Sequence, residues 1–238
     1  MSDHFQHIYA ERAEAYDRLI QAEDCEGQIL RTIERLHPLD GARVVEVGVG
    51  TGRIARQLVR AGVASVLGID DAPAMLAIAH KHLEACAPPG SRSTWQLELG
   101  DASRLPVTEG GAELVIAGWV FGHATEWAPD AWHGRIGANL DELDRVTQRG
   151  GTQILFETLG TGTDDSGAPS PELAAYYAYL EDDRSFAHHV IRTDYEFESP
   201  QAAADACAFF FGDALANRIL ERAWSRVPEW TGVWWRRR

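Results

Sequence analysis

The chain has 238 residues, of which 45% are hydrophobic and 24% charged, and its formal net charge is −14 at pH 7. This composition is ordinary for a globular protein, no apolar run approaches the roughly 20 residues that span a bilayer, and the acidic balance disfavours nucleic acid and anionic membranes as partners. The basic run at residues 236–238 is interpreted as a solvated tail. The N-terminus lacks the basic and then apolar order of a signal peptide, so a cytoplasmic protein is expected.

Cysteine and histidine spacing gives no sign of a metal site. Cys25, Cys86 and Cys207 are odd in number and far apart, which fits inert thiols in a reducing compartment. His80 and His82 are two positions apart in a helical pattern, so their side chains do not share a face. No metal site is expected.

The first two thirds of the chain alternate between strand and helix patterns. Residues 8–36 read as helical, with Ile29, Leu30, Ile33 and Leu36 at helical spacing. The β-branched run at residues 43–47 ends in glycines and is typical of a buried parallel strand. Further strands are predicted at residues 65–70, 94–99, 113–117 and 152–158. Helices are predicted around residues 54–59, from Pro73 to a break at residues 88–90, and at residues 135–148.

This alternation predicts a doubly wound α/β fold with a mostly parallel sheet and helices on both faces, preceded by an N-terminal helical segment. The later part begins with a polar Gly/Pro-rich loop at residues 159–171. No second core is evident, so one domain over residues 1–238 is expected. The later elements are predicted as a helix at 171–182, a strand at 187–197, a helix at 200–224 and a strand at 227–235.

A glycine-rich loop follows the first strand. Gly48, Gly50 and Gly52 allow a sharp turn and a close ligand approach, and the helix behind them offers free N–H groups. The dinucleotide pattern G-x-G-x-x-G would place its third glycine at position 53, which is Arg53. A NAD-dependent oxidoreductase is therefore a less favoured alternative.

The spacing G-x-G-x-G, with Glu46 upstream and Asp70 at the end of the next strand, resembles the class I S-adenosylmethionine (SAM)-dependent methyltransferases. Further segments resemble the family's later motifs in the right order, so the resemblance covers about residues 40–160. It implies a Rossmann-like, seven-stranded sheet, SAM as cofactor and S-adenosylhomocysteine (SAH) as product. It also implies a variable acceptor-side region at about residues 160–200. The later matching segments are residues 68–76, 99–106, 113–119 and 143–151.

The resemblance assigns cofactor contacts residue by residue. Asp70 is expected to accept the ribose hydroxyls, although it also suits a helix cap, a role for which Asp71 competes. Asp101 is expected to accept the adenine amino group, and Met75 either packs on the adenine or belongs to the core. Glu46 is expected near the sulfonium or amino end. The full expected set is Glu46, Gly48, Gly50, Gly52, Asp70, Asp71, Met75, Asp101, Ala102, Gly118 and Trp119.

The segment after the fourth strand should face the transferred methyl group, because ligands bind outside the carboxyl ends of parallel strands. Trp119, Phe121 and Trp127 either line an apolar pocket or cover the sheet edge. His123 is the first candidate for a general base, with a hydrogen-bonded structural role as the alternative. Glu157 is the second candidate. The variable region adds His188, His189, Tyr176, Tyr177 and Tyr195.

The sequence thus predicts metal-independent methyl transfer to an O, N or C nucleophile of a small, aromatic or apolar molecule. Holding the two reactants in line would supply most of the catalysis. A SAM-binding protein that catalyses another reaction or acts as a regulator stays open, because fold does not fix function. A homodimer stays open as well.

Overall fold

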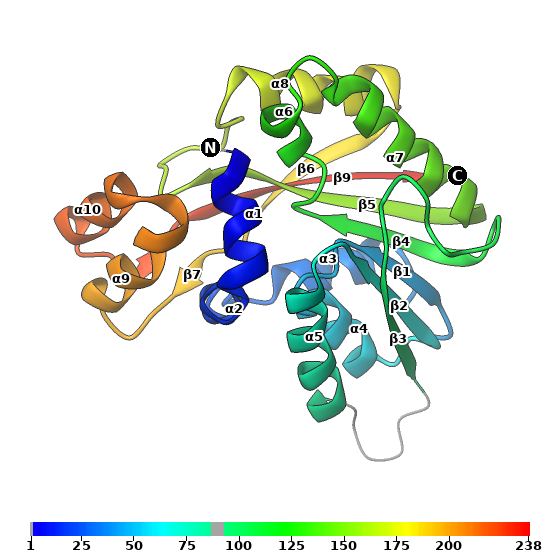
Figure 1. Ribbon diagram of the computed structural model, residues 1–238, viewed down its shortest axis with the longest axis horizontal. Helices are drawn as coiled ribbons and strands as arrows, with labels where there is room; N and C mark the ends of the chain where they lie inside the picture. The colour runs from blue at the N-terminus through cyan, green and yellow to red at the C-terminus, as the bar shows by residue number, and fades with distance from the viewer. Residues whose placement is uncertain (1, 87–92) are drawn as a thin grey trace.

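The computed structural model describes residues 2–86 and 93–238 (Figure 1). Its centre is a seven-stranded sheet with the order β3-β2-β1-β4-β5-β9-β6. A short two-stranded sheet, β7-β8, lies apart from it. The strands are β1 (Arg43–Val47), β2 (Ser65–Asp70), β3 (Thr94–Leu99), β4 (Ala112–Gly118), β5 (Thr147–Thr161), β6 (Ala187–Arg192), β7 (Tyr195–Glu196), β8 (Arg226–Val227) and β9 (Glu229–Arg237).

Strands β1 to β5 are mutually parallel, and β9 runs antiparallel to both β5 and β6. The predicted doubly wound, mostly parallel seven-stranded sheet is therefore confirmed. Strand β1 shows why the sequence forms this core, because Val44, Val45 and Val47 are all buried, as expected for a central strand with helices on both faces.

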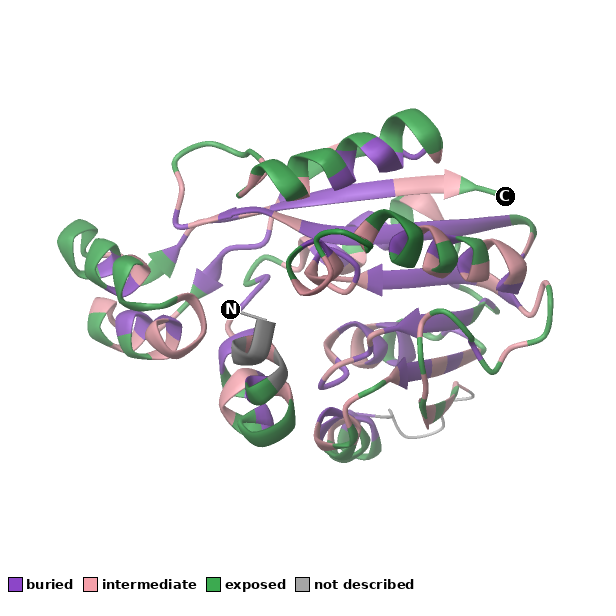
Figure 2. Ribbon diagram, turned by 45° about the horizontal axis from the view of Figure 1, so that its top comes forward, coloured by how far each residue is buried: buried purple, intermediate pink, exposed green. Residues whose placement is uncertain are grey.

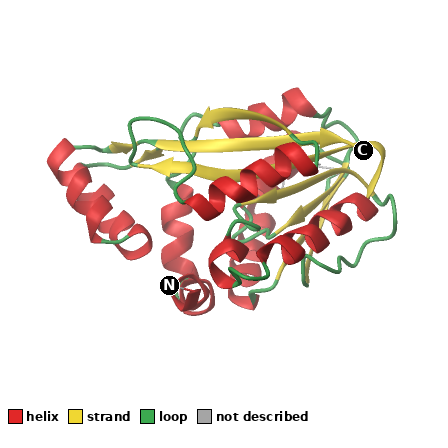
Figure 3. Cartoon of the chain, turned by 90° about the horizontal axis from the view of Figure 1, so that it is seen from above, coloured by secondary structure: helices red, strands yellow, loops and turns green. Residues whose placement is uncertain are grey.

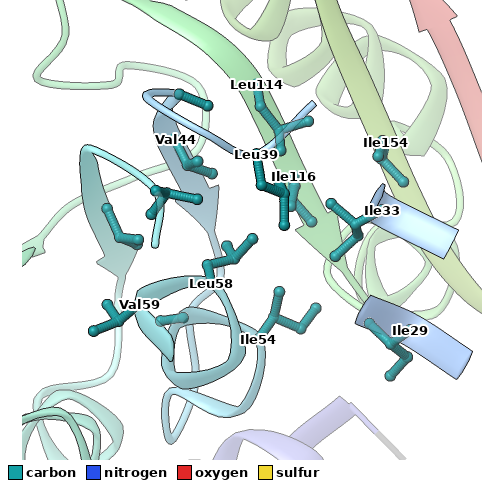
Figure 4. Packing of buried hydrophobic residues seen from close by; sticks show 14 of the residues in the cluster. Ile29, Ile33, Leu39, Val44, Ile54, Leu58, Val59, Leu114, Ile116 and Ile154 are labelled. Atoms are coloured by element: carbon teal, nitrogen blue, oxygen red, sulfur yellow. The ribbon is translucent and has the colours of Figure 1, made fainter. Parts of the chain in front are cut away.

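Helices cover both faces of the sheet (Figure 3). One face carries α3 (Gln28–Leu36), α4 (Arg53–Ala61) and α5 (Pro73–Cys86), whose apolar side chains form one core with the strands (Figure 4). The other face carries α7 (Trp132–Val146) and α8 (Pro171–Ala178), which pack in a second core. Figure 2 shows the strands buried between helices whose outer faces are exposed.

The N-terminal segment is three helices rather than the continuous helical stretch that the sequence indicated. α1 (Ser2–Glu11) and α2 (Ala13–Gln21) precede α3. The turn before α3 is stabilised by Asp24, whose carboxylate accepts the N–H groups of Gln28 at 2.6 Å and Ile29 at 3.1 Å. In Figure 1, α1 (blue) stands between α5 and the orange helices α9 (Pro200–Phe211) and α10 (Asp213–Arg222).

Two of the later elements are divided where the sequence predicted one. The predicted helix at 200–224 is wrong as one element, because Gly212 takes a φ of 84° and separates α9 from α10. The predicted strand at 187–197 is divided between β6 and β7, which belong to different sheets. The helix predicted at 171–182 is α-helical only as far as Ala178, in α8, and continues as a π-helical turn, Tyr179–Asp183. The predicted break at residues 88–90 lies outside the described residues.

The basic run at the end of the chain is not a solvated tail. Arg236 lies in β9 and donates to the Asp144 carboxylate at 2.5 Å and to the Gln153 side chain at 2.9 Å. Arg238 donates to the carbonyl oxygen of Thr147. These arginines hold β9 to β5 and α7 instead of offering a free cationic surface. Among the described residues, none of the helices combines the length and apolarity needed to traverse a bilayer.

Candidate functional site

The glycine loop joins β1 to α4 and has left-handed backbone at Gly48, Gly50 and Gly52, with φ of 68°, 54° and 84°. A side chain at Gly48 would collide with Val120, and one at Gly52 would meet Ala79 of α5 at 3.2 Å. At Gly50 no atom lies within 4 Å of where a Cβ would stand. Gly50 therefore borders open space, whereas Gly52 serves the packing of α4 on α5.

That open space is a cleft of about 690 Å³ at the carboxyl ends of β1, β2 and β4. Most of the residues expected to bind a cofactor line it, although they come from five separate segments of the chain. They are Gly48, Gly50, Asp70, Asp71, Met75, Asp101, Ala102, Gly118 and Trp119.

Asp70 ties the glycine loop to the end of β2. One carboxylate oxygen accepts the N–H of Gly50 at 2.8 Å, and the other accepts the N–H of Ala72 at 2.9 Å, directly before α5. Burial raises the pKa of Asp70. Each oxygen keeps a further acceptor site for a ligand hydroxyl, so the capping role and the ligand role are compatible. Asp71 is exposed on the same cleft.

Asp101 and Met75 offer a polar and an apolar surface to the cleft. The carboxylate of Asp101 accepts from the N–H and the hydroxyl of Ser103, both at 2.7 Å, and these bonds lower its pKa. Met75 is 2% exposed and packs in a cluster with Tyr9 and Tyr16 of the N-terminal helices. Met75 is thus both a core residue and a wall of the cleft.

Two predicted ligand residues lie elsewhere. Val47 lines the cleft and Glu46 does not. Successive residues of a strand face opposite sides of the sheet, so the side chain of Glu46 points away from the cleft. Its side chain is buried near Arg53 and α4, and burial raises its pKa to about 8. Gly52 is likewise absent from the cleft wall. The contacts of Glu46 and Gly52 with the cofactor therefore stay predictions.

Trp119, directly after β4, has an unusual backbone for a bulky residue, with a φ of 55°. Such a conformation costs about 1–3 kcal/mol and persists only where surrounding structure enforces it. Here the N–H of Trp119 donates to the carbonyl of Phe156 at 2.6 Å, and the indole stacks on the Phe156 ring at 5.8 Å between centroids. The Arg53 guanidinium lies 4.4 Å from the indole centroid. The ring is held at the wall of the cleft.

His123 begins the short helix α6 (His123–Trp127). Its imidazole stacks on Trp127 at 4.8 Å, and its Nε2 lies 3.1 Å from the Tyr9 hydroxyl. Burial lowers the pKa of His123 to about 4. The imidazole is consequently neutral at pH 7 and is a weaker base than an exposed histidine.

A second cavity of about 750 Å³, hereafter the chamber, adjoins the cleft. Tyr9, Tyr16, Trp119 and His123 line both cavities, so these four side chains separate the cleft from the chamber. The chamber is also bordered by the loop after β5 and by residues of α9 and α10. A ligand in the cleft and a second molecule in the chamber would meet at this shared wall.

Glu157, on β5, lines the chamber and is 4% exposed. One of its oxygens accepts the N–H of Gly122 at 3.1 Å and the hydroxyl of Tyr176 at 3.2 Å. Burial raises the pKa of Glu157 to about 7. The chain thus places a carboxylate that exchanges its proton near neutrality beside the segment that carries His123.

The other residues of the variable region divide between the chamber and the core. Tyr195 lines the chamber. His188 stacks on Trp234 at 4.4 Å and lines neither cavity, and Tyr177 donates to the carbonyl of Thr158 at 2.7 Å. Phe121 and Trp127 line the cleft.

Several lining residues escaped sequence reasoning. Tyr9 and Tyr16 come from α1 and α2, and Glu23, Arg53 and Glu229 line the chamber. Arg53 forms an ion pair with Glu23 at 2.6 Å, and the Tyr195 hydroxyl donates to the same carboxylate at 3.2 Å. Tyr9 and Tyr16 lie on separate helices and meet at the chamber by tertiary packing, so no local pattern in the sequence indicates them. Over residues 2–86 and 93–238, no group of three or more His, Cys, Asp or Glu side chains is arranged to hold a metal ion.

Comparison with known proteins shows what this part of the chain resembles. Residues 44–151, less than half of the chain, match the family model described as a methyltransferase domain. These residues are therefore similar to that family. The predicted family resemblance is thus confirmed over the glycine loop, the cleft and the start of β5. The curated proteins contain no match to the chain.

Solved structures share the fold of the methyltransferase domain at low sequence identity. They include a methyltransferase of Bacillus halodurans, with 16% identity, coverage of 89% of this chain and 99% of that chain, and a TM-score of 0.55. A SAM-dependent methyltransferase of Aquifex aeolicus has 13% identity, coverage of 92% and 96%, and a TM-score of 0.55. The [4+2]-cyclase SpnF has 19% identity, coverage of 89% and 80%, and a TM-score of 0.53. At these identities the likeness establishes the fold.

Proposed function

We propose that the protein transfers the methyl group of SAM to an O, N or C nucleophile of a small molecule, with the cofactor in the cleft and the acceptor in the chamber. The observation that carries this proposal is the wall of Tyr9, Tyr16, Trp119 and His123 common to the two cavities. A methyl group can pass between reactants only if they are nearly in contact and in line. Two adjoining cavities with a shared wall meet this requirement.

The cleft fits the cofactor in its chemistry. Gly50 leaves open the space that a Cβ would fill, Asp70 presents a carboxylate for ribose hydroxyls, and Asp101 presents one for an amino group. The Aquifex aeolicus protein of the same fold is SAM-dependent. When bound, SAM would supply a methyl group attached to a positively charged sulfur. Loss of that methyl group turns the sulfonium into the uncharged thioether of SAH, which is the leaving group.

Glu157 suits the role of proton acceptor better than His123. A general base works best when its pKa is near the operating pH. The pKa of Glu157 is about 7, whereas that of His123 is about 4. We therefore assign Glu157 to take the proton of an acceptor that must lose one, and His123 to orient the wall through Tyr9 and Trp127.

A small acceptor also fits the size and charge of the chamber. Ligand pockets of about 300–1,000 Å³ are typical of small molecules, and the chamber has about 750 Å³. The net charge of −14 opposes binding to nucleic acid. Because residues from Tyr9 to Glu229 line this one chamber, we propose that the chain acts as a single domain.

Calorimetric titration with SAH and with NAD tests the assignment of the cleft. Tight SAH binding and at least tenfold weaker NAD binding are expected, and the reverse order would refute it. A screen with methyl-labelled SAM against small molecules then tests transfer. Binding of SAH without transfer to any acceptor would favour another reaction in the same cavities.

A further inference from the structure

One acid of the chamber has no internal partner for half of its carboxylate. Glu229, at the start of β9, is 2% exposed. Its Oε1 accepts the Thr158 hydroxyl at 3.0 Å, and hydrogen bonding from the Thr161 side chain to the carboxylate also lowers its pKa. Its Oε2 is buried without a hydrogen-bond partner in the part of the chain that the structure describes. A buried acceptor left unsatisfied costs about 1–3 kcal/mol, and more when it is charged.

The charges around Glu229 do not compensate for it. Arg53 is already paired with Glu23 at 2.6 Å, and Arg218 donates to the carbonyl of Gly162 at 3.0 Å. Burial and the neighbouring charge of Glu23 raise the pKa of Glu229 to about 8. The chamber is lined by five acids and these two arginines, and the acids whose pKa is raised, Glu157 and Glu229, become ionised when a cation binds beside them. The acids are Glu23, Glu126, Glu157, Asp165 and Glu229.

Seven aromatic residues also line the chamber. Rings of α1, α2 and the segment after β4 meet rings of β7 and α9 around the same space. Aromatic faces attract cations by about 0.5–2 kcal/mol each, most strongly where water is excluded. The aromatic residues of the chamber are Phe5, Tyr9, Tyr16, Trp119, Tyr195, Phe210 and Phe211.

From the free oxygen of Glu229, the acidic lining and the aromatic walls, we propose that the acceptor is an organic cation with a protonated amine, which Glu229 binds through Oε2. This inference rests on the proposed function, because it assigns the substrate class of the same chamber. An ammonium group supplies the donors that Oε2 lacks, and the ion pair would repay the cost of burying the carboxylate. A carboxylate or phosphate acceptor would instead meet like charge.

Glu229 lines the chamber and not the cleft. In the sheet it pairs with Thr161, five residues along β5 beyond Phe156, whose carbonyl holds Trp119. At about 3.3 Å per residue, this is at most roughly 17 Å along the strand from the wall that faces the cofactor. An arylalkylamine can therefore place its amine on Glu229 while the rest of the molecule extends toward that wall.

The test is calorimetric binding of three probes of similar shape, 2-phenylethylamine, 2-phenylethanol and 3-phenylpropionate, each with and without SAH. The amine is expected to bind at least tenfold more tightly than the alcohol, and the carboxylate is expected to bind most weakly. Equal binding of amine and alcohol, or tighter binding of the carboxylate, would overturn the inference. Failure of SAH to bind would instead overturn the proposed function. The affinity order of the three probes without SAH tests the inference about Glu229 separately from that outcome.

Two variants test whether Glu229 itself contributes to amine affinity. Glu229→Gln keeps the shape of the side chain but removes its charge, so amine affinity should fall at least tenfold and alcohol affinity less than twofold. Glu172→Gln removes the same charge from an exposed position that lines neither cavity, and amine affinity should change less than twofold because solvent screens that site. Equal losses from both variants would contradict a direct contact with Glu229. Unchanged SAH affinity reports that each variant is folded.

Discussion

The hydroxyl of Tyr9 lies 3.1 Å from Nε2 of His123, although 114 residues separate the two along the chain. This contact fastens α1 to the segment after β4, at the wall between the cleft and the chamber. The N-terminal helices are therefore part of the candidate site and not an appendage of the sheet. The contact also occupies one of the two ring nitrogens of His123.

We expect His123→Asn to retain the methylation rate within about tenfold, because an amide can still bond to Tyr9 and the imidazole is assigned to orientation. The methylation rate should fall further in His123→Ala, since this change removes both the hydrogen bond to Tyr9 and the stacking on Trp127. Initial rates with saturating SAM measure both. If the Asn variant lost at least about a hundredfold, which is typical of removing a general base, the assignment would pass to His123.

Glu157→Gln should lower the rate about 10²–10⁴-fold, the usual contribution of a general base, and leave SAH affinity within twofold. Only the ionised carboxylate accepts a proton, and its pKa is raised to about 7. The wild-type rate should therefore fall as the pH drops through about 7, and the variant should lack this dependence. A base at His123 would give a fall only near pH 4. A variant that keeps the dependence near pH 7 would show that another group causes it.

Asp70→Ala should weaken SAH binding at least about tenfold, whereas Asp71→Ala should change it less than threefold. Asp70 bonds to Gly50 and Ala72 and faces the cleft, and Asp71 is exposed. A lost hydrogen bond to a charged group is worth about 1.5–3 kcal/mol. Titration calorimetry measures both affinities. Equal losses of SAH affinity in the two variants would contradict the assignment of the ribose hydroxyls to Asp70.

Gly50→Ala should reduce SAH affinity at least tenfold, because a methyl group would occupy the open space beside the loop. Gly62→Ala is the matched control. It has a φ of 87° and open surroundings at the end of α4, where it does not line the cleft. Both variants carry left-handed strain of roughly 1–2 kcal/mol, so their thermal midpoints should fall alike. A similar loss of SAH affinity in both variants would mean that backbone strain, and not contact of the new methyl group with SAH, causes the loss.

The sequence predicted the cleft better than the chamber, for a physical reason. Gly50, Asp70 and Asp101 stand at the ends of consecutive parallel strands, so the fold itself brings them together. Glu229 and Tyr9 reach the chamber by tertiary packing of elements that carry no local motif. Glu46 stays a predicted ligand contact because an acid stands beside the glycine loop, but strand alternation turns its side chain toward α4. The break at Gly212 was readable in principle, since it follows an aromatic run.

Strand β9 lies between β5 and β6, and β6 has no other neighbour in the large sheet. During synthesis β6 leaves the ribosome before β9 exists, and it must wait seconds, at about 5–20 residues per second, for the strand that pairs with it. Until then both β5 and β6 present unpaired edges, which are prone to wrong association. The late arrival of β9 therefore leaves this half of the sheet open to wrong association until synthesis has passed residue 237.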